Sequence, residues 1–153
     1  MAPSTFVEAA RRDVPLLRAG QDIGSAAEAV LAAGVPALPV VDERGHFAGV
    51  FGEREFIHAV FPPYFDSLGS ARFIPRSLDA TLEVGRMNDP VSAHMTPDHV
   101  EVGADPSDAE LAETFLHHRV LIVPIVEDGH VTGIVTRSDF FRALAGRFRE
   151  LST

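Results

Sequence analysis

The alternation of apolar and polar positions predicts the same order of elements twice along the chain. Each set begins with a short apolar strand and an amphipathic helix, followed by two β-rich runs around a tight turn and a closing helix. The first set is predicted at residues 15–18, 25–33, 37–41, 46–51 and 54–60, and the second at residues 99–103, 107–118, 121–126, 130–136 and 138–147. The pattern therefore predicts a β-α-β-β-α unit that occurs twice.

The two units also match residue by residue. Residues 35–42 align with residues 120–127 at an offset of 85, and a one-residue deletion in the next turn makes the offset 84. Beyond that turn, Gly49 aligns with Gly133, and Glu55 aligns with Asp139. Matches of this number with one gap at a turn indicate an internal duplication.

The duplication divides the chain into four parts. Residues 1–13 are expected to form an N-terminal helix, because Thr5 and Glu8 have the spacing of a capping box. Residues 14–60 and 91–153 hold the two repeats, and Ser107 with Glu110 gives the second repeat a capping box of its own.

The connector between the repeats, residues 61–90, holds several prolines and cannot be a single helix. Residues 77–87 are free of proline, and we expect a partly helical insert there. The connector is too apolar for a free linker, so we expect it to pack on the module or on a partner chain.

Composition narrows the classes of function. The formal net charge of −9 and the lack of a basic stripe disfavour nucleic acids and anionic membranes as partners. No apolar run reaches the roughly 18–20 residues that span a bilayer, and the N-terminus does not resemble a signal peptide. The chain has no Cys, which removes disulfides and thiolate chemistry. We therefore expect a cytoplasmic protein.

No catalytic or metal-binding arrangement stands out. All 13 basic residues are Arg, so a Schiff-base lysine is excluded. His117 and His118 point about 100° apart on a helix and cannot chelate as an i, i+4 pair would. Surface histidines are favoured over a metal site built with His94 and His99. We expect neither an enzyme nor a metal site.

The segment at residues 133–139 has the features of a binding loop. Gly133 allows close packing or a ligand beside its strand, and the Thr136 hydroxyl can meet a polar ligand or cap the next helix. Asp139 falls in the first helical turn and could accept hydrogen bonds from both hydroxyls of a ribose. The helix N-terminus and Arg137 supply positive potential for a phosphate. The alternative is that Thr136 and Asp139 only cap the helix.

The duplicated unit resembles a tandem of CBS domains, also called a Bateman module. Residues 124–126, Pro-Ile-Val, stand where that family has Pro-Val-Val, and residues 133–139 fit its pattern of Gly, an apolar residue, Ser/Thr and Asp. The resemblance covers residues 14–60 and 91–147. It implies an α/β (α+β) fold in which two pseudo-twofold-related repeats form one module.

The resemblance also implies a site for an adenosine-containing ligand in the cleft between the repeats. Thr136 and Asp139 would hold its phosphate and ribose, beside Gly133, Ile134 and Arg137. The base would lie against the backbone that precedes the apolar runs, which is Leu121 and Ile122 in the second repeat and Pro36 and Ala37 in the first.

The first repeat departs from the family pattern. Gly52 stands where a Ser or Thr is expected and supplies no hydroxyl, and Glu55 replaces Asp with a side chain one methylene longer. We expect its site to be degenerate.

The function predicted from the sequence is the non-catalytic, regulatory sensing of AMP, ADP, ATP or S-adenosylmethionine, with no resident cofactor. The alternative is a ligand-free dimeric module that regulates a partner enzyme or transporter. The resemblance implies a homodimer formed through helices, and we expect the apolar face of the last helix to contribute to it. That face comprises Phe140, Phe141, Leu144 and Phe148.

Overall fold

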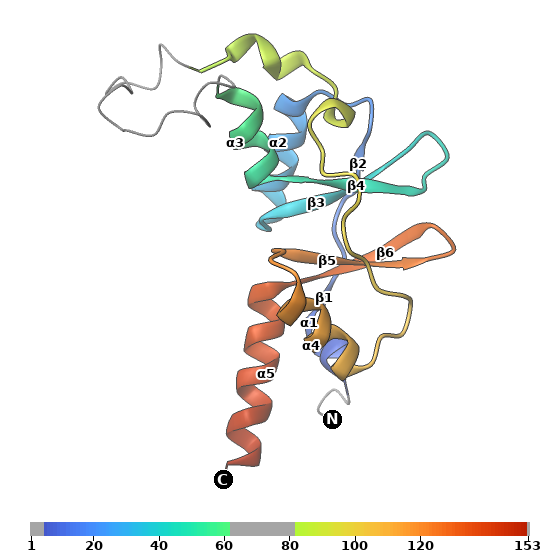
Figure 1. Ribbon diagram of the computed structural model, residues 1–153, viewed down its shortest axis with the longest axis vertical. Helices are drawn as coiled ribbons and strands as arrows, with labels where there is room; N and C mark the ends of the chain where they lie inside the picture. The colour runs from blue at the N-terminus through green and yellow to red at the C-terminus, as the bar shows by residue number, and fades with distance from the viewer. Residues whose placement is uncertain (1–4, 62–81, 153) are drawn as a thin grey trace, which may run out of the picture.

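The computed structural model describes residues 5–61 and 82–152, which form two sheets with helices packed on them (Figure 1). The elements follow the chain in the order α1 (Phe6–Ala10), β1 (Arg11–Arg12), β2 (Leu17–Arg18), α2 (Ile23–Ala33), β3 (Ala37–Val41), β4 (Phe47–Gly52), α3 (Glu53–Val60), η3 (Val84–Asn88), η4 (Val91–Ala93), α4 (Asp108–His117), β5 (Ile122–Glu127), β6 (His130–Thr136) and α5 (Arg137–Leu151). No helix among the described residues is long and apolar enough to span a membrane.

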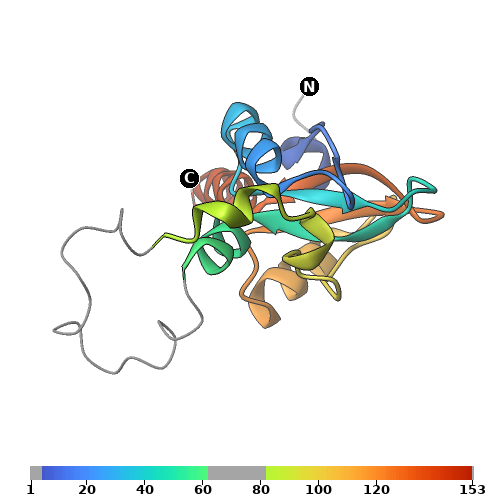
Figure 2. The ribbon, with the colours of Figure 1, turned by 90° about the horizontal axis from the view of Figure 1, so that it is seen from above.

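The two halves have the same plan, as the repeat predicted. The first sheet has the strand order β2-β3-β4 and carries α2 and α3, and the second has the order β1-β6-β5 and carries α1, α4 and α5. The two sheets are stacked, as the view from above shows (Figure 2). The helices start where the capping residues predicted, since the side chains of Thr5 and Ser107 accept the backbone N–H groups of Glu8 and Glu110.

The N-terminal segment packs on the second half of the molecule. Strand β1 pairs antiparallel with β6, with Arg11 opposite Val135 and Arg12 opposite Ile134. The α1 residue Val7 is buried in the second hydrophobic core. A segment that precedes the first repeat in sequence therefore completes the sheet of the second.

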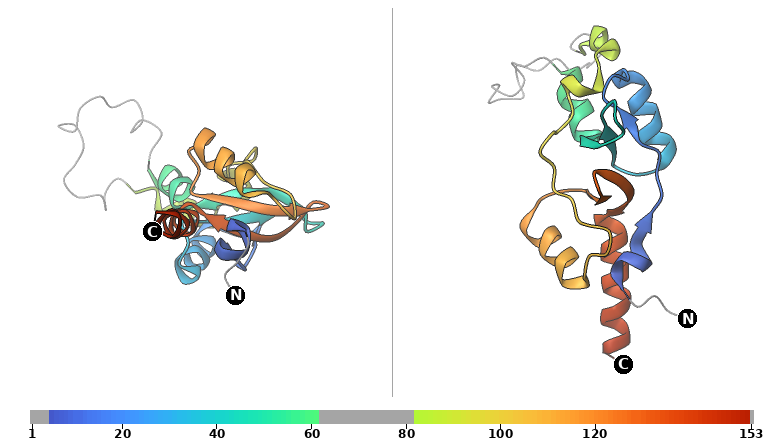
Figure 3. Two further views of the ribbon diagram at one scale, coloured as in Figure 1. Left: turned by 90° about the horizontal axis from the view of Figure 1, so that it is seen from below. Right: turned by 90° about the vertical axis from the view of Figure 1, so that its right-hand side faces the viewer.

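The chain that enters the second repeat makes the reciprocal contact with the first. Thr96 and Val50 exchange two backbone hydrogen bonds, of 3.0 and 2.9 Å, at the edge strand β4. Val91, which we assigned to the second repeat, is fully buried in the first core. The two crossing segments run along opposite sides of the molecule (Figure 3, right).

Both crossings depend on glycine. A Cβ at Gly49 would lie 2.6 Å from the carbonyl oxygen of Thr96, and a Cβ at Gly133 would lie 3.0 Å from that of Arg12. The contact at Gly49 is too close for any side chain, and the contact at Gly133 is so tight that the crossing chain would have to shift. The paired glycines of the repeat are therefore explained by the close approach of the crossing backbone.

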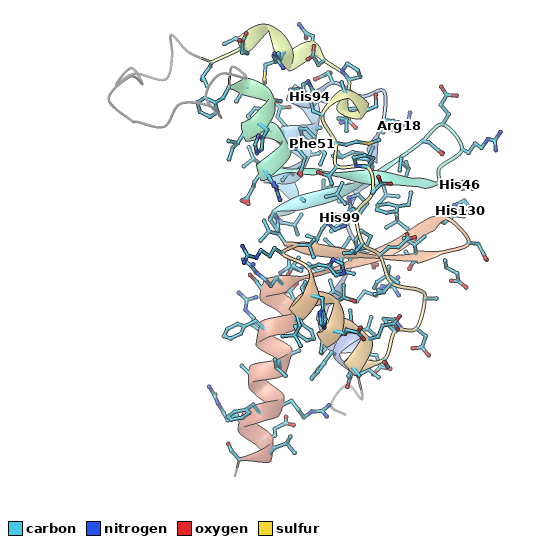
Figure 4. All side chains as sticks on the ribbon, viewed as in Figure 1. Arg18, His46, Phe51, His94, His99 and His130 are labelled. Carbon is cyan, nitrogen blue, oxygen red and sulfur yellow. The ribbon has the colours of Figure 1, made fainter. Side chains whose placement is uncertain are left out.

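The halves share buried side chains where the sheets meet. Ile122 and Ile134 belong to the second repeat, but both are buried in the first core with residues such as Leu38 and Phe51. The hairpin tips also touch, because the rings of His46 and His130 lie with centroids 5.0 Å apart (Figure 4). The equivalent hairpins of the two repeats are therefore in contact at their tips.

Several predicted boundaries differ from the structure. Helix α1 ends at Ala10, before the end of the segment 1–13 in which the helix was predicted. The strand predicted at residues 99–103 is reduced to one bridge, between Val102 and Ile125. Of the helix predicted at residues 77–87, residues 77–81 lie outside the described part. The rest is a 3-10 helix that starts only at Val84.

The prediction that Phe140 lies on the exposed face of the last helix is wrong. Its side chain is buried and packs against Phe6 and Phe115, with ring centroids 5.4 and 5.0 Å away. Adjacent helical residues point about 100° apart, so burying Phe140 leaves Phe141 outside. The exposed strip of α5 consists of Phe141, Leu144, Phe148 and Leu151.

Candidate ligand-binding site

A cleft of about 120 Å³ lies where the two repeats meet. It is lined by Pro36, Ala37, Val50, Arg54, Glu55, Thr96, His99, Arg119, Val120, Leu121 and Ile122. The segments before β3 and β5 both contribute to its wall, as the pseudo-twofold arrangement requires. Four residues predicted to contact the base, which are Pro36, Ala37, Leu121 and Ile122, are therefore brought together.

The backbone at these positions holds the starts of the closing helices. The carbonyl of Pro36 accepts the N–H of Glu53, and the carbonyl of Leu121 accepts the N–H of Arg137, each at 2.9 Å. These two hydrogen bonds occupy equivalent places in the two repeats. Each segment that was predicted to contact the base is thereby tied to the helix that bears the acidic residue of its own repeat.

Glu55 provides the carboxylate of the cleft. Its Oε1 accepts the N–H of Gly52 and its Oε2 accepts the hydroxyl of Thr96, each at 2.9 Å. Both donors are neutral, and a carboxylate oxygen can accept more than one hydrogen bond. The longer side chain in the first repeat therefore still brings an acceptor group to the cleft.

Gly52 has a structural reason to lack a side chain. A Cβ at this position would overlap the carbonyl oxygen of Pro36 and the Cα and Cβ atoms of Ala37. The hydroxyl that the second repeat carries at Thr136 therefore cannot be accommodated in the first repeat with this backbone. The prediction of a departure from the family site at Gly52 is thus given a physical cause.

Basic side chains line the same cleft as this carboxylate. Arg54 and Arg119 both line the cleft and are exposed, and neither has an ion-pair partner among the residues that the structure describes. A second depression, of about 290 Å³, adjoins the first through Arg54, Glu55 and Thr96 and adds His58 and His94. The region can therefore attract an anionic group.

His99 lies at the seam between the halves (Figure 4). Burial lowers the pKa of its imidazole, and this effect outweighs the hydrogen bond with the carbonyl of Val100 and the charge of Glu55, which both raise it. The ring is therefore neutral near pH 7 and offers the cleft a hydrogen-bonding group without a charge.

Thr136 and Asp139 do not line this cleft. The Thr136 hydroxyl accepts the N–H of Asp139 at 3.0 Å and caps α5, and its side chain is buried. The carboxylate of Asp139 accepts hydrogen bonds from Arg12, 2.5 Å from Nε to Oδ2 and 3.1 Å from Nη2 to Oδ1. Arg142 adds a contact of 3.4 Å. The structure thus shows the capping geometry that we weighed as the alternative.

The other residues of the second repeat that were predicted to bind the ligand lie in the core, against the crossing segment or at the surface. Ile134 is fully buried, Gly133 lies against Arg11 and Arg12, and Arg137 is exposed at the start of α5. No group of three metal-ligating side chains occurs in the described part of the chain.

Sequence reasoning missed Thr96, His99, Arg119 and Arg12. The internal repeat could have indicated Thr96 and Arg12, because the offset of 84 that aligns Glu55 with Asp139 also aligns Arg12 with Thr96. In each half, the crossing segment thus brings one of these residues to the carboxylate.

Comparison with known proteins agrees with this architecture. The sequence profile of the CBS domain family matches residues 7–62 and 91–146. The chain therefore belongs to the CBS domain family and is a tandem CBS module, as the resemblance predicted.

The sequence relatives are longer proteins. The chain is 28% identical to an uncharacterised protein of Methanocaldococcus jannaschii over 134 residues. This alignment covers 88% of this chain and 30% of that protein. It is 35% identical over 63 residues to inosine-5'-monophosphate dehydrogenase of Streptococcus pyogenes, covering 40% of this chain and 13% of the enzyme. The chain therefore spans less than a third of either relative, and the match does not carry the dehydrogenase activity to it.

Solved structures share the fold over nearly the whole chain. A CBS domain-containing protein of Kribbella flavida has a TM-score of 0.70 at 23% identity, covering 92% of this chain and 98% of that one. The protein CBSX2, crystallised in complex with AMP, has a TM-score of 0.67 at 21% identity, and the match covers 94% of this chain and 98% of that one. These similarities establish the shared fold.

The Arg12–Asp139 pair predicts a pH dependence of stability. The hydrogen bond from Arg12 is the main cause that lowers the pKa of the Asp139 carboxyl in the folded protein. Its contribution is fully present above the unfolded pKa, about 3.9, and is lost as the pH falls through the lower folded pKa. Because Arg12 is partly exposed, Asp139→Asn should cost about 1 kcal/mol at pH 7.

Urea unfolding at several pH values measures this difference. The gap between the original protein and Asp139→Asn should close as the pH falls toward 2, and Asp105→Asn, on the surface, controls for the loss of one charge. A gap that stayed constant down to pH 2 would show that the carboxylate does not stabilise the folded state through its charge.

Proposed function

We propose that this CBS module binds an adenosine-containing ligand in the cleft between its repeats and acts as a regulatory sensor. The observation that carries the proposal is the convergence of Pro36, Ala37, Leu121 and Ile122 on one cleft with the Glu55 carboxylate. The AMP complex of CBSX2, which has the same fold, supports this class of ligand.

Each part of such a ligand has a suitable group in the cleft. The apolar wall formed by Ala37 and Ile122 suits the faces of a purine, and nearby backbone groups can read its edge. The Glu55 carboxylate can accept hydrogen bonds from the ribose hydroxyls. Arg54 and Arg119 can hold a phosphate through their guanidinium groups. This arrangement favours AMP, ADP or ATP over S-adenosylmethionine, whose sulfonium is positively charged.

Regulation would work through linkage without turnover. The cleft is built from both repeats, so a ligand that contacts both walls stabilises one relative position of the two halves. It can shift the conformational equilibrium only by the difference in its affinity for the two states. The output would then reach a partner enzyme or transporter through a change in the module or its dimer.

The carboxylate can be tested by isothermal titration calorimetry with AMP, ADP, ATP and S-adenosylmethionine. Glu55→Gln keeps an acceptor for the N–H of Gly52 but loses the charge, and it should weaken nucleotide binding at least about 10-fold, as the loss of a charged hydrogen bond does. Glu53→Gln removes a neighbouring exposed acid that does not line the cleft, and it should bind as the original protein does.

The alternative function makes the opposite prediction. A protein that gave no heat with any of the four ligands, yet retained a stable partner in pull-down experiments, would be a ligand-free interaction module.

We also propose that the exposed strip of α5 binds a second copy of the chain. Phe141, Phe148 and Leu151 are 67, 73 and 80% exposed, and they lie along α5, whose C-terminal end projects from the body (Figure 1). An exposed apolar strip of this kind favours association with another protein surface. The family resemblance implies that this surface belongs to a second copy of the chain.

Sedimentation velocity tests the dimer. The original protein should sediment as a dimer, and Phe148→Asp should sediment as a monomer because a charge would be buried without a partner. As a control, Leu116→Asp changes an apolar residue on α4 that is at least as exposed as Phe148, and this variant should remain dimeric. A monomeric original protein, or a dimer lost only with Leu116→Asp, would contradict this assignment.

A further inference from the structure

The acidic residues of the two repeats occupy equivalent places but have opposite surroundings. Glu55 and Asp139 both lie in the first turn of a closing helix, α3 or α5. Beside each one, a crossing segment pairs with the preceding strand, where Thr96 lies opposite Val50 and Arg12 lies opposite Ile134. The repeat therefore presents one carboxylate to a hydroxyl and the other to a guanidinium.

The guanidinium of Arg12 occupies both oxygens of Asp139. Its Nε donates to Oδ2 at 2.5 Å and its Nη2 donates to Oδ1 at 3.1 Å. A two-point contact of this kind is stronger and more directional than a contact with a neutral donor. The Asp139 side chain retains only 12% of its exposure under this contact.

A ribose presents two neighbouring hydroxyls, which require the same two carboxylate oxygens. To bind Asp139, a neutral diol would have to displace the charged guanidinium of Arg12. This guanidinium belongs to the same chain, and strand β1 holds it beside Asp139. At Glu55 the competing donors are the Thr96 hydroxyl and the Gly52 N–H, which are neutral, and the carboxylate already lines an open cleft.

We infer that Arg12 determines which of the two equivalent positions takes the ligand. It fills the Asp139 position, so that the protein binds one adenosine-containing ligand per chain, at Glu55, although the second repeat carries the motif closer to the family pattern. This inference rests on the proposed function, because it assigns the position and the stoichiometry of the same ligand.

The neighbouring residue provides a matched control. Arg11 lies on the same strand, carries the same charge and donates from Nη2 to the carbonyl of Thr132, away from Asp139. Arg11→Ala therefore removes one guanidinium and one tie of β1 to β6 while leaving the Asp139 carboxylate covered. Arg12→Gln serves beside Arg12→Ala as a variant that keeps a polar, though shorter, side chain and removes the charge.

Isothermal titration calorimetry with AMP, on the full chain, measures the stoichiometry. The original protein and Arg11→Ala should bind one AMP per chain, and Arg12→Ala and Arg12→Gln should bind two. Adding Asp139→Asn to Arg12→Ala should return the stoichiometry to one, and adding Glu55→Gln should weaken the other site. Thermal unfolding of each variant, followed by circular dichroism, confirms that the titrated protein is folded.

The results separate this inference from the proposed function. Two AMP bound by the original protein, or one AMP bound by both folded Arg12 variants, would overturn the role of Arg12 and leave ligand binding intact. A second site that survives Asp139→Asn would overturn it as well. No binding by the original protein or by any variant would overturn both proposals.

Discussion

The structure depends on the exchange of short backbone segments between its two halves. Strand β1, which precedes the first repeat, pairs with β6 of the second, and Thr96, which opens the second repeat, pairs with β4 of the first. Gly49 and Gly133 favour this pairing, because a Cβ at Gly49 would overlap the crossing chain and a Cβ at Gly133 would crowd it. Neither sheet is complete without the other half of the sequence, and this constraint fixes where the halves meet.

The same exchange explains how a duplicated scaffold carries two different sites. Each crossing segment delivers one side chain to the acidic residue of the half it joins, and a single difference at that position changes the chemistry. Thr96 leaves the Glu55 carboxylate available beside Arg54 and Arg119. Arg12 neutralises Asp139 and covers it. The repeat that matches the family motif more closely is thus the one whose carboxylate is already in use.

Local features of the fold were predictable because local physical rules determine them. Apolar periodicity located the helices and hairpins, and the capping residues Thr5 and Ser107 marked two helix starts that the structure confirms. The internal repeat predicted the order of elements, and the family resemblance carried by the repeat implied the fold. Phe140 was misassigned because it lies next to Phe141 in sequence, and the tertiary positions of Phe6 and Phe115 decide which ring is buried.

The candidate site was predictable in its apolar part and in the position of Glu55, although the sequence led us to expect a degenerate site there. Pro36, Ala37, Leu121 and Ile122 follow from the repeat and the family pattern. The partner of Asp139 does not, because Arg12 lies 127 residues away in sequence and reaches it through the strand exchange. From the sequence, Gly52 is interpreted only as the loss of a hydroxyl. In the structure, its lack of a side chain lets the backbone of Pro36 approach strand β4.

A crystal structure of the protein grown with AMP would show which of the two carboxylates holds the ligand. We predict one nucleotide per chain, with its base between the segments at Ala37 and Ile122, its ribose against Glu55, and the Arg12–Asp139 pair intact. A nucleotide whose ribose contacts Asp139, with Arg12 displaced and the Glu55 cleft empty, would contradict it.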